Sequence, residues 1–334
     1  MSYRKQGSDV LDDPLVVRYL EFVEARARRN TVLAVVSDLG IFLSLVGKDP
    51  TAVKTDDVLR FVADQRAPRF EGKVVRLADG EAGLRASTIK RRLSSVSGFY
   101  SFLVMIDVID RNPVPAGMAT RRSRRHRRST VSLVRVPRLL PKILEPVEVK
   151  ALFTALRRVR DRAMVEAMVL GGLRRCEVLG LRLEDLRPAE RRVMVVDGKG
   201  GHQRMVSISP RFFRSVSVYM QSERPENAST DRLFVVLKGP RRGQPLSEDG
   251  LEEIIRAAKA RAGLVHATCH ELRHTCFTRL REAGMSLEAI QAQAGHRSIE
   301  TTRLYLHLSN DWLADEYQRA AELIDLSMLE AVAR

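Results

Sequence analysis

The chain has 334 residues, of which 44% are hydrophobic and 29% are charged, and its formal net charge is +16. This length allows two domains with separate cores, no apolar run approaches the roughly 18 residues of a membrane span, and the N-terminus lacks the apolar segment of a secretory signal. The positive charge predicts a nucleic-acid partner and no membrane partner, because Lys and Arg gain affinity for a polyanion by displacing its counterions.

The first third of the sequence predicts a bundle of helices. Apolar residues recur at helical spacing after Pro14 and again after Thr31. Two more helices are expected over 55–64 and 87–103, where polar residues at the start can act as caps. We therefore predict a helical domain over residues 12–115, and in so basic a chain we expect it to take part in binding DNA.

Three adjacent basic residues lie near the start of the last of these helices: Lys90, Arg91 and Arg92. Such a cluster can be a solvated charged turn, or it can face a groove of DNA. The residues alone leave both interpretations open. In a chain this basic, we treat all three as candidate DNA contacts.

Prolines and positive charge together mark an interdomain linker at residues 116–145. Between Arg121 and Lys142 the sequence contains no acidic residue. So dense a block of like charge needs solvent or an anionic partner. Its first part supplies the expected DNA contacts of the linker, which are Arg121, Arg122, Arg124, Arg125, Arg127 and Arg128.

The second half predicts helices around a β-hairpin. Two β-rich runs, 191–196 and 204–208, are joined by the glycine-rich segment Asp197–His202. Helical patterns occupy most of the rest, at 147–159, at 161–170, from Cys176, and at 212–223, 251–262, 270–283, 287–294, 299–306 and 312–326. The fold class expected for residues 146–334 is mainly α with a small antiparallel β-sheet, an α+β domain that ends in a tail helix.

Six widely spaced residues in this half have side chains suited to a single reaction. They are Arg174, Lys199, His270, Arg273, His296 and Tyr305. Attack of a tyrosine on a phosphodiester forms a covalent phosphotyrosine, and fixed donors must stabilise the charge of the transition state. Arginine suits this because its planar guanidinium binds two phosphate oxygens and stays charged. Each residue alone would be ordinary, but the set indicates phosphoryl transfer to a tyrosine.

The segments around these residues resemble the signature of the tyrosine site-specific recombinases, the phage integrase family. The matching segments are Gly172-Leu173-Arg174-Arg175-Cys176-Glu177, Gly198-Lys199-Gly200, His270-Glu271-Leu272-Arg273-His274-Thr275, Gly295-His296-Arg297 and Thr301-Thr302-Arg303-Leu304-Tyr305. The resemblance covers residues 142 to about 310, and more loosely the first domain, which is similar to the family's helical core-binding (SAM-like) domain. The departures are Gly171, where threonine is common, and a polar insertion at 69–84.

The resemblance implies a role for each residue of the set. Tyr305 would attack the scissile phosphate and form a 3′-phosphotyrosine, while Arg174 and Arg273 hold the non-bridging oxygens. Lys199, on its glycine-flanked turn, would protonate the leaving 5′-hydroxyl as general acid. The ordinary alternative for Lys199 is an exposed turn lysine.

Two histidines and an acidic residue complete the implied site. His270 would assist proton transfer from the nucleophile, His296 would hydrogen-bond the phosphate, and Glu177 matches a supporting acidic position. No metal or cofactor is expected, because the phosphotyrosine conserves the bond energy until a 5′-hydroxyl attacks it. The implied protein is a cytoplasmic, nucleoid-associated recombinase or integrase that cleaves and rejoins double-stranded DNA. Its process would be integration, excision or transposition of a mobile element, or resolution of chromosome dimers.

Two other classes of protein remain as alternatives. Residues 270–274 form a literal H-E-x-x-H, the pattern of a zinc metallopeptidase. The extended form of that motif is absent, because Phe277 and Leu280 occupy the positions of its glycine and third histidine, although Glu300 remains as a distant ligand. A DNA-binding regulator or decayed recombinase without catalysis would share the charge and the helical first domain, and the intact six-residue set argues against it.

An apolar stripe follows the tyrosine: Trp312, Leu313, Tyr317, Ala320, Ala321, Leu323, Ile324 and Met328. It can pack within its own domain, or it can dock on a neighbouring protomer, as the corresponding tail does in relatives. Docking implies a homotetramer on two DNA sites, with accessory or sister recombinases as further partners. Only about a dozen residues precede the first helix, so we do not expect an arm-binding domain that would set direction.

Overall fold

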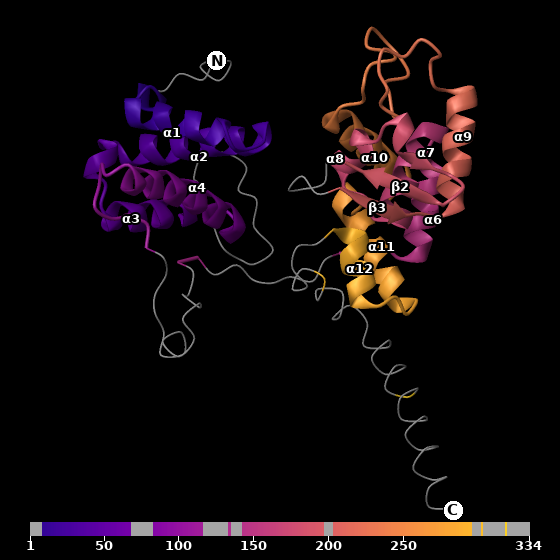
Figure 1. The fold of residues 1–334 in the computed structure, drawn as a ribbon. Coiled ribbons are helices and arrows are strands. Elements are labelled where there is room, and N and C mark those ends of the chain that lie inside the picture. The colour runs from indigo at the N-terminus through magenta and orange to yellow at the C-terminus, as the bar shows by residue number, and fades with distance from the viewer. Residues whose placement is uncertain are drawn as a thin grey trace, which may run out of the picture. The chain divides into compact units, whose positions relative to one another are not determined.

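The computed structural model describes residues 9–67, 83–115, 133–134, 142–196, 203–295, 302 and 318. The chain divides into two compact units, Met1–Arg138 and Leu139–Arg334 (Figure 1). Most of the expected linker, 116–145, lies outside the described residues, so its limits stay a prediction. Val134, inside that range, is buried in the core of the first unit.

The first unit contains the helices that the spacing of its apolar residues predicts. The α-helices among its described residues are α1 (Pro14–Glu24), α2 (Arg29–Val46), α3 (Thr55–Arg66) and α4 (Ala86–Met105), with short 3-10 segments η1 (Asp9–Leu11) and η2 (Pro50–Ala52). The Asp13 carboxylate caps α1 by accepting from the amide of Leu15 at 2.8 Å, and Pro14 occupies the first turn. Gly47 ends α2 in the left-handed conformation, with φ +61°.

Aromatic rings fill the core between these helices. Phe42 of α2 makes edge contacts with Phe61 of α3 and Tyr100 of α4, at centroid distances of 5.0 and 6.2 Å. Among the described residues, α2 alone is long and apolar enough to cross a membrane by length and composition. Its Leu39 and Leu43 are fully buried with Phe42, so its apolar face forms part of this core.

The second unit combines helices with a small sheet, as predicted. Its described elements are α6 (Pro146–Ala155), α7 (Val159–Gly171), α8 (Arg175–Gly180), η3 (Leu183–Asp185), β1 (Leu186–Arg187), β2 (Arg192–Val195), β3 (Arg204–Ser207), α9 (Pro210–Ser222), α10 (Glu248–Arg261), α11 (Cys269–Glu282) and α12 (Leu287–Ala294). The predicted pairing of β2 with β3 is confirmed. The sheet also has a third antiparallel strand, β1, in the order β1-β2-β3, which the sequence did not predict because two residues show no alternation. The turn at 197–202 and the helical patterns at 299–306 and 312–326 lie outside the described residues, apart from the single helical positions 302 and 318.

Helix α7 lies at the centre of this unit, packed against α9 and α11 (Figure 1). Every residue from Ala163 to Val169 is buried, including the charged Glu166, so the helix is covered on all sides along this stretch. Gly172 ends α7 with φ +66°, and a Cβ there would lie 2.4 Å from Cζ of Phe277 on α11. Only glycine therefore allows the turn before Arg174 to pack this closely on α11.

Two buried tyrosines provide a test of these cores. Tyr219 donates to the carbonyl of Leu233 at 3.1 Å and accepts from the amide of Val235 at 3.3 Å, whereas no described residue hydrogen-bonds to the buried hydroxyl of Tyr100. Tyr219→Phe should lower the free energy of unfolding of the second unit by about 1–3 kcal/mol, because a buried amide loses its partner. Tyr100→Phe should leave that of the first unit within about 0.5 kcal/mol of the wild type.

Hydrogen exchange in increasing urea, followed separately on peptides from each unit, measures both effects. Equal losses in the two variants would contradict this account of the hydroxyls.

Candidate active site

The structure describes four of the seven residues that the sequence places in the site. Arg174, Glu177, His270 and Arg273 belong to the second unit. Lys199, His296 and Tyr305 lie outside the described residues, as do the linker arginines Arg121, Arg122, Arg124, Arg125, Arg127 and Arg128.

Arg174 is the N-cap residue of the short helix α8, and Glu177 holds it there. The Arg174 amide donates to Oε2 of Glu177 at 2.9 Å, and its Nη1 donates to Oε1 at 2.6 Å. The Glu177 side chain is fully buried, whereas that of Arg174 is 22% exposed. The carboxylate therefore caps the helix and orients a guanidinium that still reaches solvent.

A second arginine, which the sequence did not indicate, binds the same carboxylate. Arg204 at the start of β3 donates through Nη1 and Nη2 to the two oxygens of Glu177, at 3.0 and 2.9 Å. This is the parallel two-bond arrangement that only a guanidinium can make. No residue pattern could have identified Arg204, because its partner lies 27 positions earlier in the chain.

Arg273 joins the cluster from α11. Its guanidinium donates to the carbonyl of Gly172 and, at 2.8 Å, to that of Ala294, and its Nη1 lies 3.8 Å from Oε2 of Glu177. Its Cζ also lies 4.7 Å from the centre of the Phe277 ring. The two arginines predicted to hold one phosphate are therefore both paired with Glu177, although they are 99 positions apart in the sequence.

The charges of this cluster leave a positive excess. Burial alone would raise the pKa of Glu177, but hydrogen bonds and charge from Arg204 and Arg174 outweigh it and lower the pKa to about 2. The carboxylate is therefore ionised at neutral pH, and three guanidinium groups surround one negative charge. Two net positive charges remain, which suits the oxygens of a phosphodiester under attack.

His270 contacts His274, which the sequence indicated as functional only in the zinc alternative. The Nε2 atoms of His270 and His274, one turn apart on α11, lie 2.8 Å from each other. One ring must donate and the other accept, so the contact requires at least one neutral imidazole. Burial and the charges of Arg273 and Arg174 lower the pKa of His270, and burial with the neighbouring His270 lowers that of His274 to about 4.

This geometry does not fit the zinc interpretation of residues 270–274. Two nitrogen ligands at about 2.0–2.1 Å from a tetrahedral zinc lie about 3.3 Å apart, whereas these two are at hydrogen-bonding distance. Within the described part of the chain, no three His, Cys, Asp or Glu side chains gather as a metal site would need. Glu300 lies outside the described residues.

Gln293 on α12 is a further residue that sequence reasoning missed. Its amide donates to the carbonyls of Gly171 and Ser207, at 3.2 and 2.6 Å, and its Oε1 accepts from the Ser207 amide at 3.1 Å. It thereby ties the end of α12 to β3 and to the turn before Arg174. His296 follows this anchored segment directly.

In the first unit, the three basic residues of α4 differ from one another. Lys90 is exposed, and Arg91 is half exposed while it donates to the buried Asp38 at 2.6 Å. Arg92 is only 12% exposed and donates to Gln65, with its Nε 3.9 Å from Asp38. The carboxylate on α2 and the amide on α3 therefore draw the guanidinium of Arg92 inward, and its contact with DNA stays a prediction.

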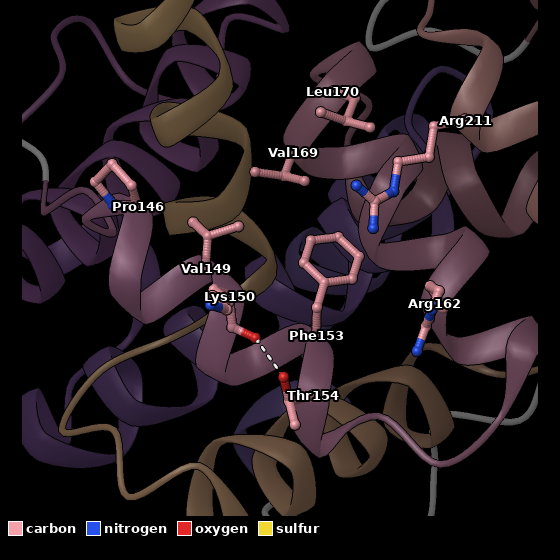
Figure 2. A pocket seen from close by; sticks show the side chains of 9 residues that line it. All are labelled: Pro146, Val149, Lys150, Phe153, Thr154, Arg162, Val169, Leu170 and Arg211. Atoms are coloured by element: carbon pink, nitrogen blue, oxygen red, sulfur yellow. Dashed lines mark hydrogen bonds between the residues drawn. The ribbon is translucent and has the colours of Figure 1, made fainter.

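A separate pocket of about 400 Å³ lies between α6, α7 and α9 (Figure 2). Its floor is apolar, with Phe153 beside Val149 and Val169. Basic side chains stand around it, and the Arg211 guanidinium lies 5.6 Å from the centre of the Phe153 ring. None of the described site residues lines this pocket, so it is a different surface from the arginine cluster.

The histidine pair makes stability dependent on pH. The folded state holds the pKa of His274 near 4, below the ordinary value of 6.5, and therefore favours the neutral ring. Its contribution to stability should be complete above pH 6.5 and should be lost as the pH falls towards 4. NMR should show no protonation of His274 above about pH 5.

In His274→Gln the free energy of unfolding should fall less steeply between pH 6.5 and 4, because glutamine takes up no proton there. A His274 ring that titrates near pH 6.5 in the folded protein would contradict this.

Known proteins resemble this chain in sequence and in fold. The model of the phage integrase family matches residues 142–311. A tyrosine recombinase XerC of Roseiflexus castenholzii is 30% identical over 86% of this chain and 86% of its own length, and a XerD of Lacticaseibacillus casei is 30% identical over 91% and 96%. The same fold occurs in the Tn1549 transposon integrase in complex with transposon right end DNA, with a TM-score of 0.68, 18% identity and coverage of 92% of this chain and 98% of that one. A lambda integrase dimer bound to a core site has a TM-score of 0.63, 17% identity and coverage of 89% and 95%. The chain is therefore a member of the phage integrase family, a tyrosine recombinase.

Proposed function

We propose that this recombinase transfers DNA strands through Tyr305, with Arg174 and Arg273 as the phosphate-binding residues. The observation that carries the proposal is the buried Glu177, which pairs with both arginines and with Arg204, so that two net positive charges remain at one place. Attack by the Tyr305 hydroxyl forms the bond from its oxygen to phosphorus and breaks the bond to the 5′-oxygen. The phenol proton leaves by way of His270, and the 5′-oxygen gains a proton from Lys199.

The positions of Lys199 and His296 are supported by their described neighbours. β3 begins five residues after Lys199, and Arg204 at its start is bonded to Glu177. Ala294, two residues before His296, accepts from Arg273. The segments that carry both residues are thus attached to the arginine cluster, which supports their proposed contacts with the scissile phosphate and the leaving group.

A covalent-adduct assay tests the nucleophile. A binding site is first selected from a pool of random-sequence duplexes and is then nicked close to the cleavage point, so that the cleaved strand cannot be rejoined. The wild-type protein should form a covalent complex that survives denaturation, and Tyr305→Phe should form none, because phenylalanine has no attacking oxygen.

Tyr317→Phe, which changes another tyrosine of the same C-terminal part of the chain, should retain the adduct. Adducts in Tyr305→Phe would refute the assignment, and a wild-type protein that binds but never cleaves would favour the non-catalytic regulator.

DNA affinity is proposed to come from basic residues outside the arginine cluster. Lys90 and the outer face of Arg91 are exposed on α4, and the linker arginines provide the densest positive charge of the chain. Contacts to phosphates give affinity and register, whereas base contacts give specificity. We place the reaction in the cytoplasm, on DNA of the nucleoid, and propose integration, excision or transposition of a mobile element as the process.

We also propose that the protein acts as a tetramer on two DNA sites, held together by residues 311–334. This segment combines the apolar stripe with an excess of acidic residues, namely Asp311, Asp315, Glu316, Glu322, Asp325 and Glu330 against Arg319 and Arg334. The pocket of Figure 2 has the complementary character, since an apolar floor is surrounded by Lys150, Arg162 and Arg211. A tail from a second copy would bury its stripe there and place its carboxylates near these cations.

Assembly on DNA tests this docking. Deletion of residues 311–334 should weaken cooperative binding to a two-site duplex by about tenfold, with binding to one site nearly unchanged. The double charge reversal Lys150→Glu with Arg162→Glu changes exposed side chains only and should have the same effect in the full chain. Analytical ultracentrifugation with labelled DNA measures both, and unchanged assembly in either variant would exclude this pocket as the docking surface.

A further inference from the structure

Arg204 makes a hydrogen bond to the backbone of α12 in addition to its ion pair with Glu177. Its side chain is only 13% exposed, and besides the two bonds to Glu177 its Nε donates to the carbonyl of Gln293 at 3.2 Å. All three nitrogens of the guanidinium are therefore used within the protein. A lysine at this place could satisfy one of these acceptors but not all three.

The turn that leads to His296 is packed on the same side chain. Gly295 has φ +62°, and a Cβ there would lie 3.0 Å from both Cδ and Nε of Arg204. Even alanine would therefore press on the guanidinium while adopting a conformation that L-residues avoid. The backbone directly before His296 depends on the position of Arg204.

Arg204 also determines how many hydrogen-bond donors of the Arg174 side chain are available to a ligand. Glu177 is fully buried and must be balanced by positive charge. With Arg204 on both of its oxygens, the carboxylate needs only one nitrogen of the Arg174 side chain, Nη1. Without Arg204, Glu177 would draw on Arg174 and Arg273 alone, and the net charge of the cluster would fall from two to one.

We propose that Arg204 is a positioning residue for strand transfer. It holds the strand after Lys199, the helix start at Arg174 and the turn before His296 in one arrangement. The inference rests on the catalytic roles proposed above, and its test includes a measurement that does not depend on them.

The experiment compares Arg204→Lys with a matched control, Arg160→Lys. Arg160 is also buried, and it also bonds to a carboxylate, that of Asp161, and to a backbone carbonyl, that of Val235 at 2.8 Å. It lies at the opposite end of α7 from Gly172. Single-turnover cleavage at saturating protein, the Kd for a single site, thermal unfolding and hydrogen exchange are measured on both variants.

Arg204→Lys should cleave about 100-fold more slowly with a Kd within about threefold of the wild type, because the reacting groups are displaced while the DNA-binding residues are intact. Exchange should become about tenfold faster at residues 203–207 and 290–295. Arg160→Lys should lose comparable thermal stability but retain the wild-type cleavage rate and the exchange of those two segments. Gly295→Ala, which keeps the arginine, should show the same pattern as Arg204→Lys to a smaller degree.

Three results would overturn the inference. These are wild-type cleavage by Arg204→Lys, equal loss of cleavage in the Arg160→Lys control, and unchanged exchange at both segments in Arg204→Lys. Failure of the proposed function looks different, since the wild type itself would then form no adduct. In that case the exchange measurements still decide whether Arg204 orders the site.

Discussion

The second unit depends on one buried carboxylate. Ionised Glu177 has no access to solvent, and an isolated charge so placed would cost several kcal/mol. Its oxygens accept from Arg174 and Arg204 and lie close to Arg273, so the penalty is offset only while three segments remain together. Because loss of any one segment would leave a buried charge poorly paired, this carboxylate makes the arrangement of α8, β3 and α11 cooperative.

Backbone geometry extends this constraint to the residues on either side of the cluster. Gly172 lets the turn before Arg174 lie against Phe277, and Gly295 lets the turn before His296 lie against Arg204. Both turns present carbonyls, those of Gly172 and Ala294, to the Arg273 guanidinium. An arginine expected only to bind phosphate therefore also joins two turns of the protein, which fixes its direction before any DNA is bound.

Local sequence patterns predicted the helices and strands, whereas contacts with residues far away in the sequence determine where individual side chains lie. The helices α1 to α4 and the pairing of β2 with β3 follow from apolar spacing, and the set of six residues that includes Arg174 and Arg273 indicated a phosphate site, although neither arginine alone would have done so. Arg204 could not be found this way. An arginine on a strand is usually exposed, and the sequence does not show that the carboxylate of Glu177, on another element, binds this one. The inward orientation of Arg92 could not be predicted for the same reason, because Asp38 and Gln65 come from other helices. The strand β1 has only two residues, too few to show the alternation of apolar and polar residues that indicates a strand.

The arginines that would bind the phosphate also lower the basicity of His270, the proposed acceptor of the tyrosine proton. Burial comes first in lowering the pKa of His270, and the neighbouring Arg273 and Arg174 lower it further. In the free protein the ring is therefore neutral at physiological pH and can accept a proton, but it is a weak base. A bound phosphodiester would bring negative charge to the same arginines and so reduce their effect on the imidazole. The basicity of His270 would then rise when DNA occupies the cluster, which would favour proton transfer from the tyrosine once substrate is in place.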